Sequence, residues 1–248
     1  MSDILIFAIS FVAAFVFSLG GVGAAIILVP VLTAIGIPFN MAKPIGLFNN
    51  MASMIGATIS NIRNKRSDIR TGIPIIIFSF LFAIIGAYAT KFIPVIYIMI
   101  LFVVFLLFSS FMFLFFKNKG RNKYREDRPF FLLSMIGVAA GLLAGLLGIG
   151  GGSVISPLML MSGYNPKKIT VITAFAIPFS AFSAFVTYWA MGSINWHLLL
   201  VVSSAGVVGA TLGTAYMQKN LNAATVKKIL AVILFLMAIK LGWSIITN

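Results

Sequence analysis

The residues best suited to chemistry are two clusters of glycine, each inside a long apolar stretch. The first cluster is Gly20, Gly21 and Gly23, and the second is Gly150, Gly151 and Gly152, followed directly by Ser153. Glycine costs a helix roughly 1 kcal/mol relative to alanine, so each cluster predicts a helix break. A helix that begins after a break presents unpaired N–H groups and the positive end of its dipole. The two clusters are therefore predicted to bind a small anion between them.

Polar side chains inside the apolar stretches form a second group of candidates. Asn49 and Asn50 are the most polar pair, and Ser53, Thr173 and Ser180 lie in equally apolar surroundings. Amide groups are costly in hydrocarbon, so both asparagines are expected to face the protein interior. Contact with the anion and contact between helices remain alternatives for these amides. The three hydroxyl groups have the further alternative of binding carbonyls of their own helix.

The glycines also have a structural interpretation. Gly141 and Gly145 form the small-xxx-small pattern that is typical of membrane helices in close contact. Packing does not require consecutive glycines, so the run at Gly150, Gly151 and Gly152 favours a binding site. A dinucleotide fingerprint is a poor fit, because no strand, turn and helix unit surrounds the run and no acidic residue follows it.

Acidic residues are scarce and cysteine is absent. The four acidic residues are Asp3, Asp68, Glu126 and Asp127, which lie at the terminus or in basic loops. Their positions argue against a cation substrate, a carboxylate proton relay and a carboxylate metal site. The lone histidine, His197, has no acidic partner within a span and is a weak catalytic signal. The chain is therefore predicted not to be an enzyme and to need no cofactor or metal.

The composition is that of a polytopic helical protein in a lipid bilayer. Of the 248 residues, 61% are hydrophobic and 9% are charged, and the mean hydropathy is +1.12. The excess of 18 Lys and Arg over 4 Asp and Glu could suggest nucleic acid as a partner. These basic residues lie in short loops between apolar runs, which the positive-inside rule explains better. Nucleic acid is therefore not expected as a partner.

The chain repeats its glycines and prolines in one fixed register. The matched pairs are Gly21 with Gly148, Gly23 with Gly150, Pro30 with Pro157 and Gly36 with Gly163, and no gap is needed between them. This repeat register predicts two tandem repeats, residues 1–116 and 129–248, joined by a basic linker at 117–128.

Each repeat is predicted to contain a Gly-broken helical hairpin followed by three transmembrane helices. The first repeat has a broken segment at 4–36 and spans at about 44–62, 72–90 and 95–116. The second has a broken segment at 129–162 and spans at about 169–190, 196–217 and 224–247. Each half of a broken segment is shorter than the roughly 20 residues of a full crossing. The predicted fold class is an all-α polytopic membrane protein.

Charge distribution distinguishes inverted from parallel repeats. The loops at 63–70 and 117–128 hold four and six Lys or Arg residues, so both are predicted to be cytoplasmic. If each broken segment returns to its own side, fifteen of the eighteen basic residues face the cytoplasm, against ten if it crosses. The count favours inverted repeats, with parallel repeats as the alternative.

Two segments carry a family resemblance. The segments GGVGAAIILVPVLTAIGIPFNMAK, at 20–43, and GLLGIGGGSVISPLMLMSGYNPKK, at 145–168, resemble the duplicated Gly-rich signature of the sulfite exporter TauE/SafE family. The first copy departs from the family pattern at Val22, Ala24 and Gly46. The resemblance implies a multi-pass transporter in a prokaryotic plasma (inner) membrane. It also implies small sulfur-containing anions, such as sulfite, sulfonates or related organosulfur acids, as substrates.

Export is the expected direction, because an inside-negative potential drives anions outward without a coupling ion. An anion channel and proton-coupled anion uptake remain alternatives, and an intramembrane enzyme or an assembly factor is a more remote one. The expected partners are a small sulfite- or sulfonate-like anion and the lipid bilayer. A homo-oligomer and a monomer both remain open.

Overall fold

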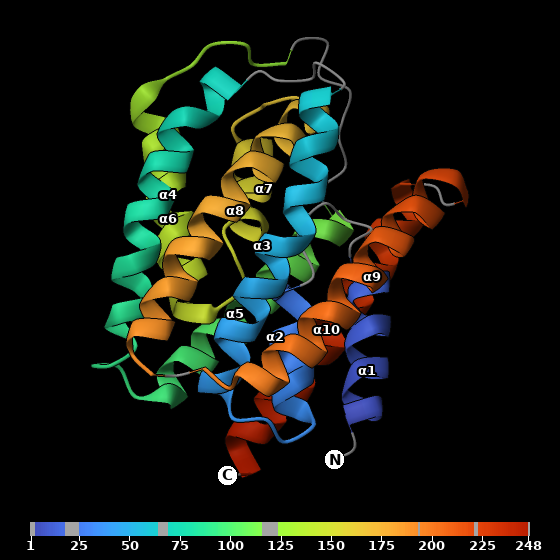
Figure 1. Cartoon of the computed structure of the whole chain (residues 1–248). Coiled ribbons are helices and arrows are strands. Elements are labelled where there is room, and N and C mark those ends of the chain that lie inside the picture. Colours follow the sequence, from blue (N-terminus) through green and yellow to red (C-terminus); the bar gives the residue numbers. More distant parts are fainter. Residues whose placement is uncertain are drawn as a thin grey trace.

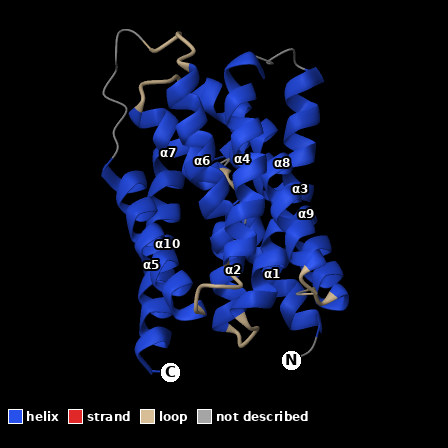
Figure 2. Cartoon of the chain, turned by 90° about the vertical axis from the view of Figure 1, so that its left-hand side faces the viewer, coloured by secondary structure: helices blue, strands red, loops and turns tan. Residues whose placement is uncertain are grey.

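The structure is a computed structural model that describes residues 3–17, 25–63, 69–115, 124–192, 194–220 and 223–247. Within these residues every regular element is an α-helix (Figure 2). Helices satisfy all their backbone hydrogen bonds internally, which is required of chain that crosses hydrocarbon. The prediction of an all-α fold is confirmed.

The helices follow one another with short connections. In chain order they are α1 (Asp3–Phe17), α2 (Ala25–Ala34), α3 (Phe39–Arg63), α4 (Ile69–Ala89), α5 (Val95–Phe115), α6 (Phe130–Leu147), α7 (Gly152–Met161), α8 (Pro166–Ala190), α9 (Trp196–Asn220) and α10 (Ala223–Thr247). Among the described residues, five stretches are long and apolar enough to cross a membrane, and they lie in α4, α5, α6, α8 and α9. The protein is therefore a multi-pass membrane protein in which shorter apolar helices accompany the spans.

The outer surface is apolar, as a lipid-facing surface must be. In α5 the exposed side chains include Ile100, Val104, Phe108 and Phe111, which repeat at helical spacing along one face. Because lipid removes most of the hydrophobic drive between helices, their association depends on close packing of small residues.

Small residues provide that close packing between α4 and α6. A Cβ atom placed on Gly141 would lie 2.6 Å from the carbonyl oxygen of Ser79, and one on Gly137 would lie 2.9 Å from that of Ile75. Gly145 approaches the backbone of α4 in the same way, at Ala83. The packing interpretation of Gly141 and Gly145 therefore fits the geometry.

The helix bounds follow the repeat register that pairs Gly21 with Gly148. This register relates α2 to α7 and α3 to α8 at both ends, and it relates the starts of α1 and α6 and of α4 and α9. The helix contacts correspond in the same register. Helix α4 packs on α6, and their counterparts α9 and α1 pack on each other. Likewise, α2 packs on α3, and their counterparts α7 and α8 pack on each other. Helix α3 also packs on α8, and α5 packs on α10.

The chain ends and the linker lie at opposite ends of the bundle. Both termini lie at the lower edge of Figure 1, whereas the described part of the linker, 124–128, crosses the upper edge. Helix α7 lies in the upper half, and α1 and α2 lie in the lower half (Figure 1).

Helix α3 begins earlier than the sequence pattern predicts. The predicted span started at about 44, one residue after Lys43, but the helix begins at Phe39. The carbonyl of Pro38 accepts hydrogen bonds from the N–H groups of Met41 and Ala42, which starts the helix directly after the proline. Lys43 therefore belongs to the helix rather than to a loop.

Candidate functional site

The break between α6 and α7 is a tight reversal built from glycines. Gly148 has φ +74° and closes α6 by donating its N–H to the carbonyl of Ala144, and Gly150 has φ +72°. Positive φ values of this kind favour glycine, which explains the residue type at both positions. Helix α7 starts immediately afterwards, and Gly151 at its N-cap provides no side-chain cap. The first N–H groups of α7 therefore have no partner within their own helix.

One face of α3 lies along this break. Lys43, Gly46 and Asn50 have the spacing i, i+3 and i+7, which places them on the same side of a helix. A Cβ atom on Gly148 would lie 2.5 Å from Lys43 Cβ, and one on Gly46 would lie 3.1 Å from the Gly148 carbonyl oxygen. Asn50 Nδ2 donates to the carbonyl of Ile149 at 3.1 Å, so the amide holds the reversal directly.

Helix α8 closes the other side of the break. A Cβ atom on Gly151 would lie 3.1 Å from Ser180 Oγ, and one on Gly150 would lie 3.7 Å from Ile177 Cγ2. Ser180 is fully buried, and its hydroxyl donates to the carbonyl of Ile177 at 3.2 Å. Since α3 and α8 also pack on each other, the start of α7 lies where two long helices meet.

The structure brings together Asn50, Gly150, Gly151 and Ser180, four of the residues that the sequence analysis assigned to the candidate site. The two other predicted residues of α7 are at the same helix start: Gly152 is its first residue, and Ser153 Oγ donates to the Gly150 carbonyl at 3.2 Å.

Three other predicted residues make different contacts. Asn49 is buried on another face of α3, where its amide lies directly against Gly206 of α9. Ser53 Oγ donates to the carbonyl of Asn49 at 2.8 Å, and Thr173 Oγ1 donates to that of Ile169 at 2.9 Å. Both hydroxyls thus bind their own helices, as the Ser180 hydroxyl also does, which was the structural alternative for all three. The first glycine cluster, Gly20, Gly21 and Gly23, lies outside the described residues.

Several buried polar atoms of α3 have no hydrogen-bond partner among the described residues. They are Asn50 Oδ1, both amide atoms of Asn49, and Lys43 Nζ. Leaving a buried polar atom unpaired costs about 1–3 kcal/mol, so these atoms mark positions where a further partner would be stabilising.

Lys43 is the functional candidate that the sequence prediction missed. Its side chain is fully buried, and Nζ lies 5.1 Å from the ring centroids of both Phe39 and Tyr188. The Tyr188 hydroxyl donates to the carbonyl of Gly145 at 2.7 Å, which fixes this ring against the last turn of α6. The signal was present in the spacing, because Lys43 precedes Gly46 and Asn50 by three and seven residues.

The family model described as "Sulfite exporter TauE/SafE" matches residues 6–241, which is nearly the whole chain. The chain belongs to the sulfite exporter TauE/SafE family. This confirms the resemblance of the two glycine-rich segments. The family indicates a membrane transporter rather than an enzyme.

Two relatives that are matched over most of their length are named as probable membrane transporters, and a plant relative that is matched over a shorter stretch carries the family name. "Probable membrane transporter protein YunE" of Bacillus subtilis (strain 168) is 26% identical over 268 residues, and the match covers 97% of each chain. "Probable membrane transporter protein MJ0441" of Methanocaldococcus jannaschii is 28% identical over 237 residues, covering 87% of this chain and 86% of the relative. "Sulfite exporter TauE/SafE family protein 6" of Arabidopsis thaliana is 37% identical over 97 residues, covering 38% of this chain and 23% of the plant protein.

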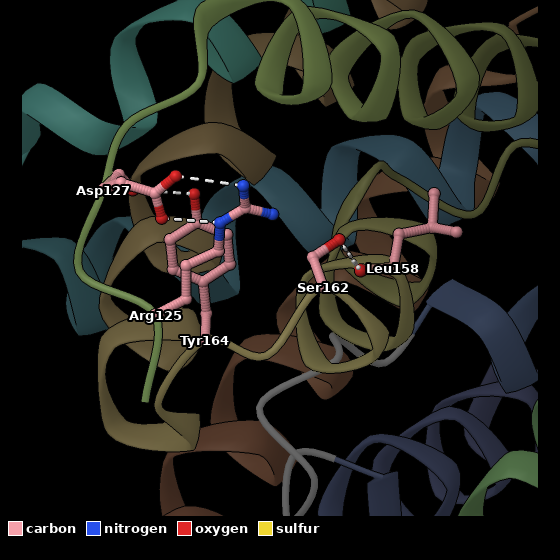
Figure 3. Close-up of polar contacts among 5 residues, drawn as sticks. All are labelled: Arg125, Asp127, Leu158, Ser162 and Tyr164. Carbon is pink, nitrogen blue, oxygen red and sulfur yellow. Dashed lines mark hydrogen bonds and ion pairs between the residues drawn. The ribbon is translucent and has the colours of Figure 1, made fainter. Parts of the chain in front are cut away.

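In this TauE/SafE protein, a polar cluster fastens the far end of α7 to the linker (Figure 3). The Arg125 N–H donates to the Gly163 carbonyl at 2.9 Å, and the Tyr164 hydroxyl donates to the Asp127 carbonyl at 3.0 Å. Arg125 also pairs with the Asp127 carboxylate at 2.5 Å and 3.0 Å, which lowers the pKa of that carboxyl. Burial raises the pKa of the Tyr164 hydroxyl. The C-terminal end of α7 is thereby fixed while its N-terminal end meets α3 and α8.

Proposed function

We propose that this protein exports small sulfur-containing anions, such as sulfite or sulfonates, through a site at the α6–α7 break. The observation that carries the proposal is the start of α7 between α3 and α8, beside Asn50 and Ser180. Backbone N–H groups and the helix dipole favour negative charge there, by typically 0.3–1 kcal/mol and up to about 2 kcal/mol when partly buried. The family description supplies the sulfur chemistry of the substrate.

The proposed architecture is a pair of inverted repeats, each made of a Gly-broken hairpin and three spans. It is supported by the repeat register that relates the helix starts and by the exchange of packing partners between the halves. The basic linker would face the cytoplasm by the positive-inside rule. In that orientation α6 and α7 enter from the cytoplasmic side, whereas α1 and α2 enter from outside. The substrate site then lies between hairpins that approach from opposite faces of the membrane, as in other inverted-repeat transporters.

The proposed direction follows from charge. An inside-negative potential drives a singly charged anion outward with about 2.3 kcal/mol per 100 mV, so export requires no coupling ion. The acidic side chains in the described part of the chain are Asp3, Glu126 and Asp127, which all lie outside the apolar core of the helices. A carboxylate relay for protons is therefore not part of the proposed mechanism.

The proposed location is a prokaryotic plasma membrane. Two relatives matched over most of their length come from a bacterium and an archaeon, whereas the plant relative is matched over 23% of its length. The lipid bilayer is thus the expected surrounding of the apolar outer faces.

Efflux from proteoliposomes tests this function. Vesicles that contain the purified protein are loaded with sulfite or methanesulfonate, and a potassium gradient with valinomycin sets the potential. Efflux should saturate with anion concentration and accelerate when the interior is negative. Efflux no faster than from protein-free vesicles would contradict transport altogether. Flux that follows an imposed pH gradient instead of the potential would indicate proton-coupled uptake, and flux that does not saturate would indicate a channel.

A further inference from the structure

Lys43 is a charged side chain in a position where charge is costly. Among the residues whose burial is described, it is the only charged one that is fully buried. Buried charges in proteins are normally paired with an opposite charge or coordinated, because a lone charge loses its hydration. No hydrogen-bond partner contacts Nζ within the described residues. Within the part of the chain that the structure describes, the amino group of Lys43 therefore lacks both a hydrogen-bond partner and a counter-charge.

The two aromatic rings compensate Lys43 only in part. Phe39 and Tyr188 place ring centroids at 5.1 Å from Nζ, within the range of a cation–π interaction. Such an interaction attracts an ammonium group without neutralising it. A flexible four-carbon side chain can exchange this contact for a stronger one when an anion arrives.

The position of Lys43 connects it to the helix break. The aliphatic part of the Lys43 side chain packs against Gly148. Asn50, on the same face of α3, donates a hydrogen bond to the carbonyl of Ile149, the next residue of the break. The ammonium thus belongs to the wall that α3 presents to the α6–α7 break. This burial is a second observation, independent of the start of α7, that indicates a negatively charged ligand.

We propose that Lys43 binds the transported anion and acts as its counter-charge, with Phe39 and Tyr188 holding the ammonium while no anion is present. The inference rests on the proposed transport function and deepens it by naming the charged contact. One ammonium, with no carboxylate beside it among the residues that the structure describes, balances one negative charge. The favoured ligand class is therefore the singly charged oxyanion, such as a sulfonate, in preference to a dianion such as sulfate.

A purely structural role for Lys43 makes a different prediction. A cation near the C-terminal end of a helix interacts favourably with its dipole, and Lys43 lies against the end of α6 at Gly148. In that case removal of the charge would destabilise the empty protein and leave anion affinity unchanged. An anion-binding role reverses both expectations.

Lys43→Met in the full-length purified protein separates the two roles, with methanesulfonate as the probe in thermal melting and calorimetric titration. The variant should melt at the wild-type temperature or above it without anion, because an unpaired buried charge is replaced by an apolar side chain. Its dissociation constant for methanesulfonate should rise at least about tenfold, as expected for the loss of one charge-assisted contact. Lys43→Arg, which keeps the charge, should retain most of the affinity. Lys43→Gln provides the same comparison if the methionine variant does not fold.

Lys91→Met is the matched control. Lys91 also lies over an aromatic ring, with Nζ at 5.1 Å from the centroid of Tyr88, but its side chain is exposed. Its removal should leave the methanesulfonate affinity within about twofold of wild type, since an exposed pair contributes little.

The outcomes distinguish this inference from the function on which it rests. Wild-type affinity in Lys43→Met or Lys43→Gln overturns the role of Lys43 and leaves the transport proposal intact. A lower melting temperature with unchanged affinity assigns Lys43 to the end of α6 instead. Tighter binding of sulfate than of methanesulfonate overturns the proposed ligand charge. A wild-type protein that neither binds nor transports methanesulfonate or sulfite overturns the proposed function itself, and this inference with it.

Discussion

Substitution of Gly151 distinguishes a binding site from a packing contact. Gly151 has φ −67°, an ordinary helical value, so a side chain there introduces no backbone strain. Its Cβ atom would lie 3.1 Å from Ser180 Oγ and 3.4 Å from Ile155 Cδ1. Both neighbours are side-chain ends that can move by a few tenths of an ångström. Gly151→Ala should therefore cost about 1 kcal/mol of stability or less, in the range of a weakened N-cap.

Gly141→Ala is the matched control, since it makes the same change in α6. There the Cβ atom would lie 2.6 Å from the carbonyl oxygen and 2.9 Å from the Cα of Ser79. Backbone of a packed helix cannot move aside as a side chain can. The expected loss is at or above the upper end of the roughly 1–3 kcal/mol that overpacking costs. A difference of about 2 kcal/mol between the two variants corresponds to roughly 4–8 °C in melting temperature.

The larger change Gly151→Leu tests function directly. Its side chain would extend from the N-cap of α7, beside which the anion is proposed to bind. We expect the variant to insert and elute as a folded protein, with an overpacking cost of about 1–3 kcal/mol. Anion efflux from proteoliposomes should fall at least about tenfold, the result of losing roughly 1.4 kcal/mol of binding.

Two results would refute this reasoning. Wild-type efflux in Gly151→Leu would show that the anion does not approach the start of α7. Equal loss of melting temperature in Gly151→Ala and Gly141→Ala would show that Gly151 serves helix packing.

Three further predictions concern orientation and the polar contacts. Single cysteines at exposed positions should label from outside at Phe92 and from the cytoplasm at Tyr124 and Met161, and external labelling at Met161 would support parallel repeats. Tyr188→Phe should lower stability by about 0.5–1.5 kcal/mol in thermal melting, because it removes the hydrogen bond to Gly145, and an unchanged melting temperature would contradict that bond. The pair of Arg125 and Asp127 lowers the pKa of the carboxyl, so its small stabilisation is present above the ordinary value of about 4 and is lost as the pH falls through the lowered pKa. Asp127→Asn should therefore differ from wild type at pH 7 and converge with it as the pH falls through the lowered pKa, when hydrogen exchange of the linker amides is compared between the two proteins at each pH; a constant difference would exclude the ion pair as the cause.

Sequence patterns could predict the break in α6–α7 because its signal is local. Consecutive glycines weaken a helix wherever they occur, and the positive φ values at Gly148 and Gly150 are conformations that favour this residue type. The all-α fold could also be predicted from the sequence, because helices satisfy the backbone hydrogen bonds of long apolar runs within each run.

The partners of individual side chains could not be predicted in the same way. Asn49 and Asn50 are adjacent in sequence, but successive residues of a helix point about 100° apart. One amide therefore lies against Gly206 of α9 and the other holds Ile149 at the break. Only the packing of α3 between α8 and α9 decides which amide reaches the site.

The position of Lys43 depended on where α3 begins. A lysine just before a proline suggests a polar connector, and the pattern of apolar residues starts only after Pro44. The hydrogen bonds to the Pro38 carbonyl extend the helix by more than a turn and carry Lys43 inward. The predicted start of α3 left Lys43 outside the helix, whereas the observed start places it within the helix and in the protein interior.

The two halves contribute different chemistry to the proposed site, although their helices correspond. In the repeat register that pairs Gly21 with Gly148, Lys43 corresponds to Thr170, Gly46 to Thr173 and Asn50 to Ile177. Helix α3 therefore carries the charge and the amide, whereas α8 carries hydroxyl and apolar side chains at the matching positions. The described break adds backbone N–H groups from the second half. A site assembled in this way is asymmetric: charge comes from one half and backbone donors from the other. A ligand bound there would stabilise the contact between the halves through both contributions, so its affinity should be sensitive to any change in how α3 packs on α8.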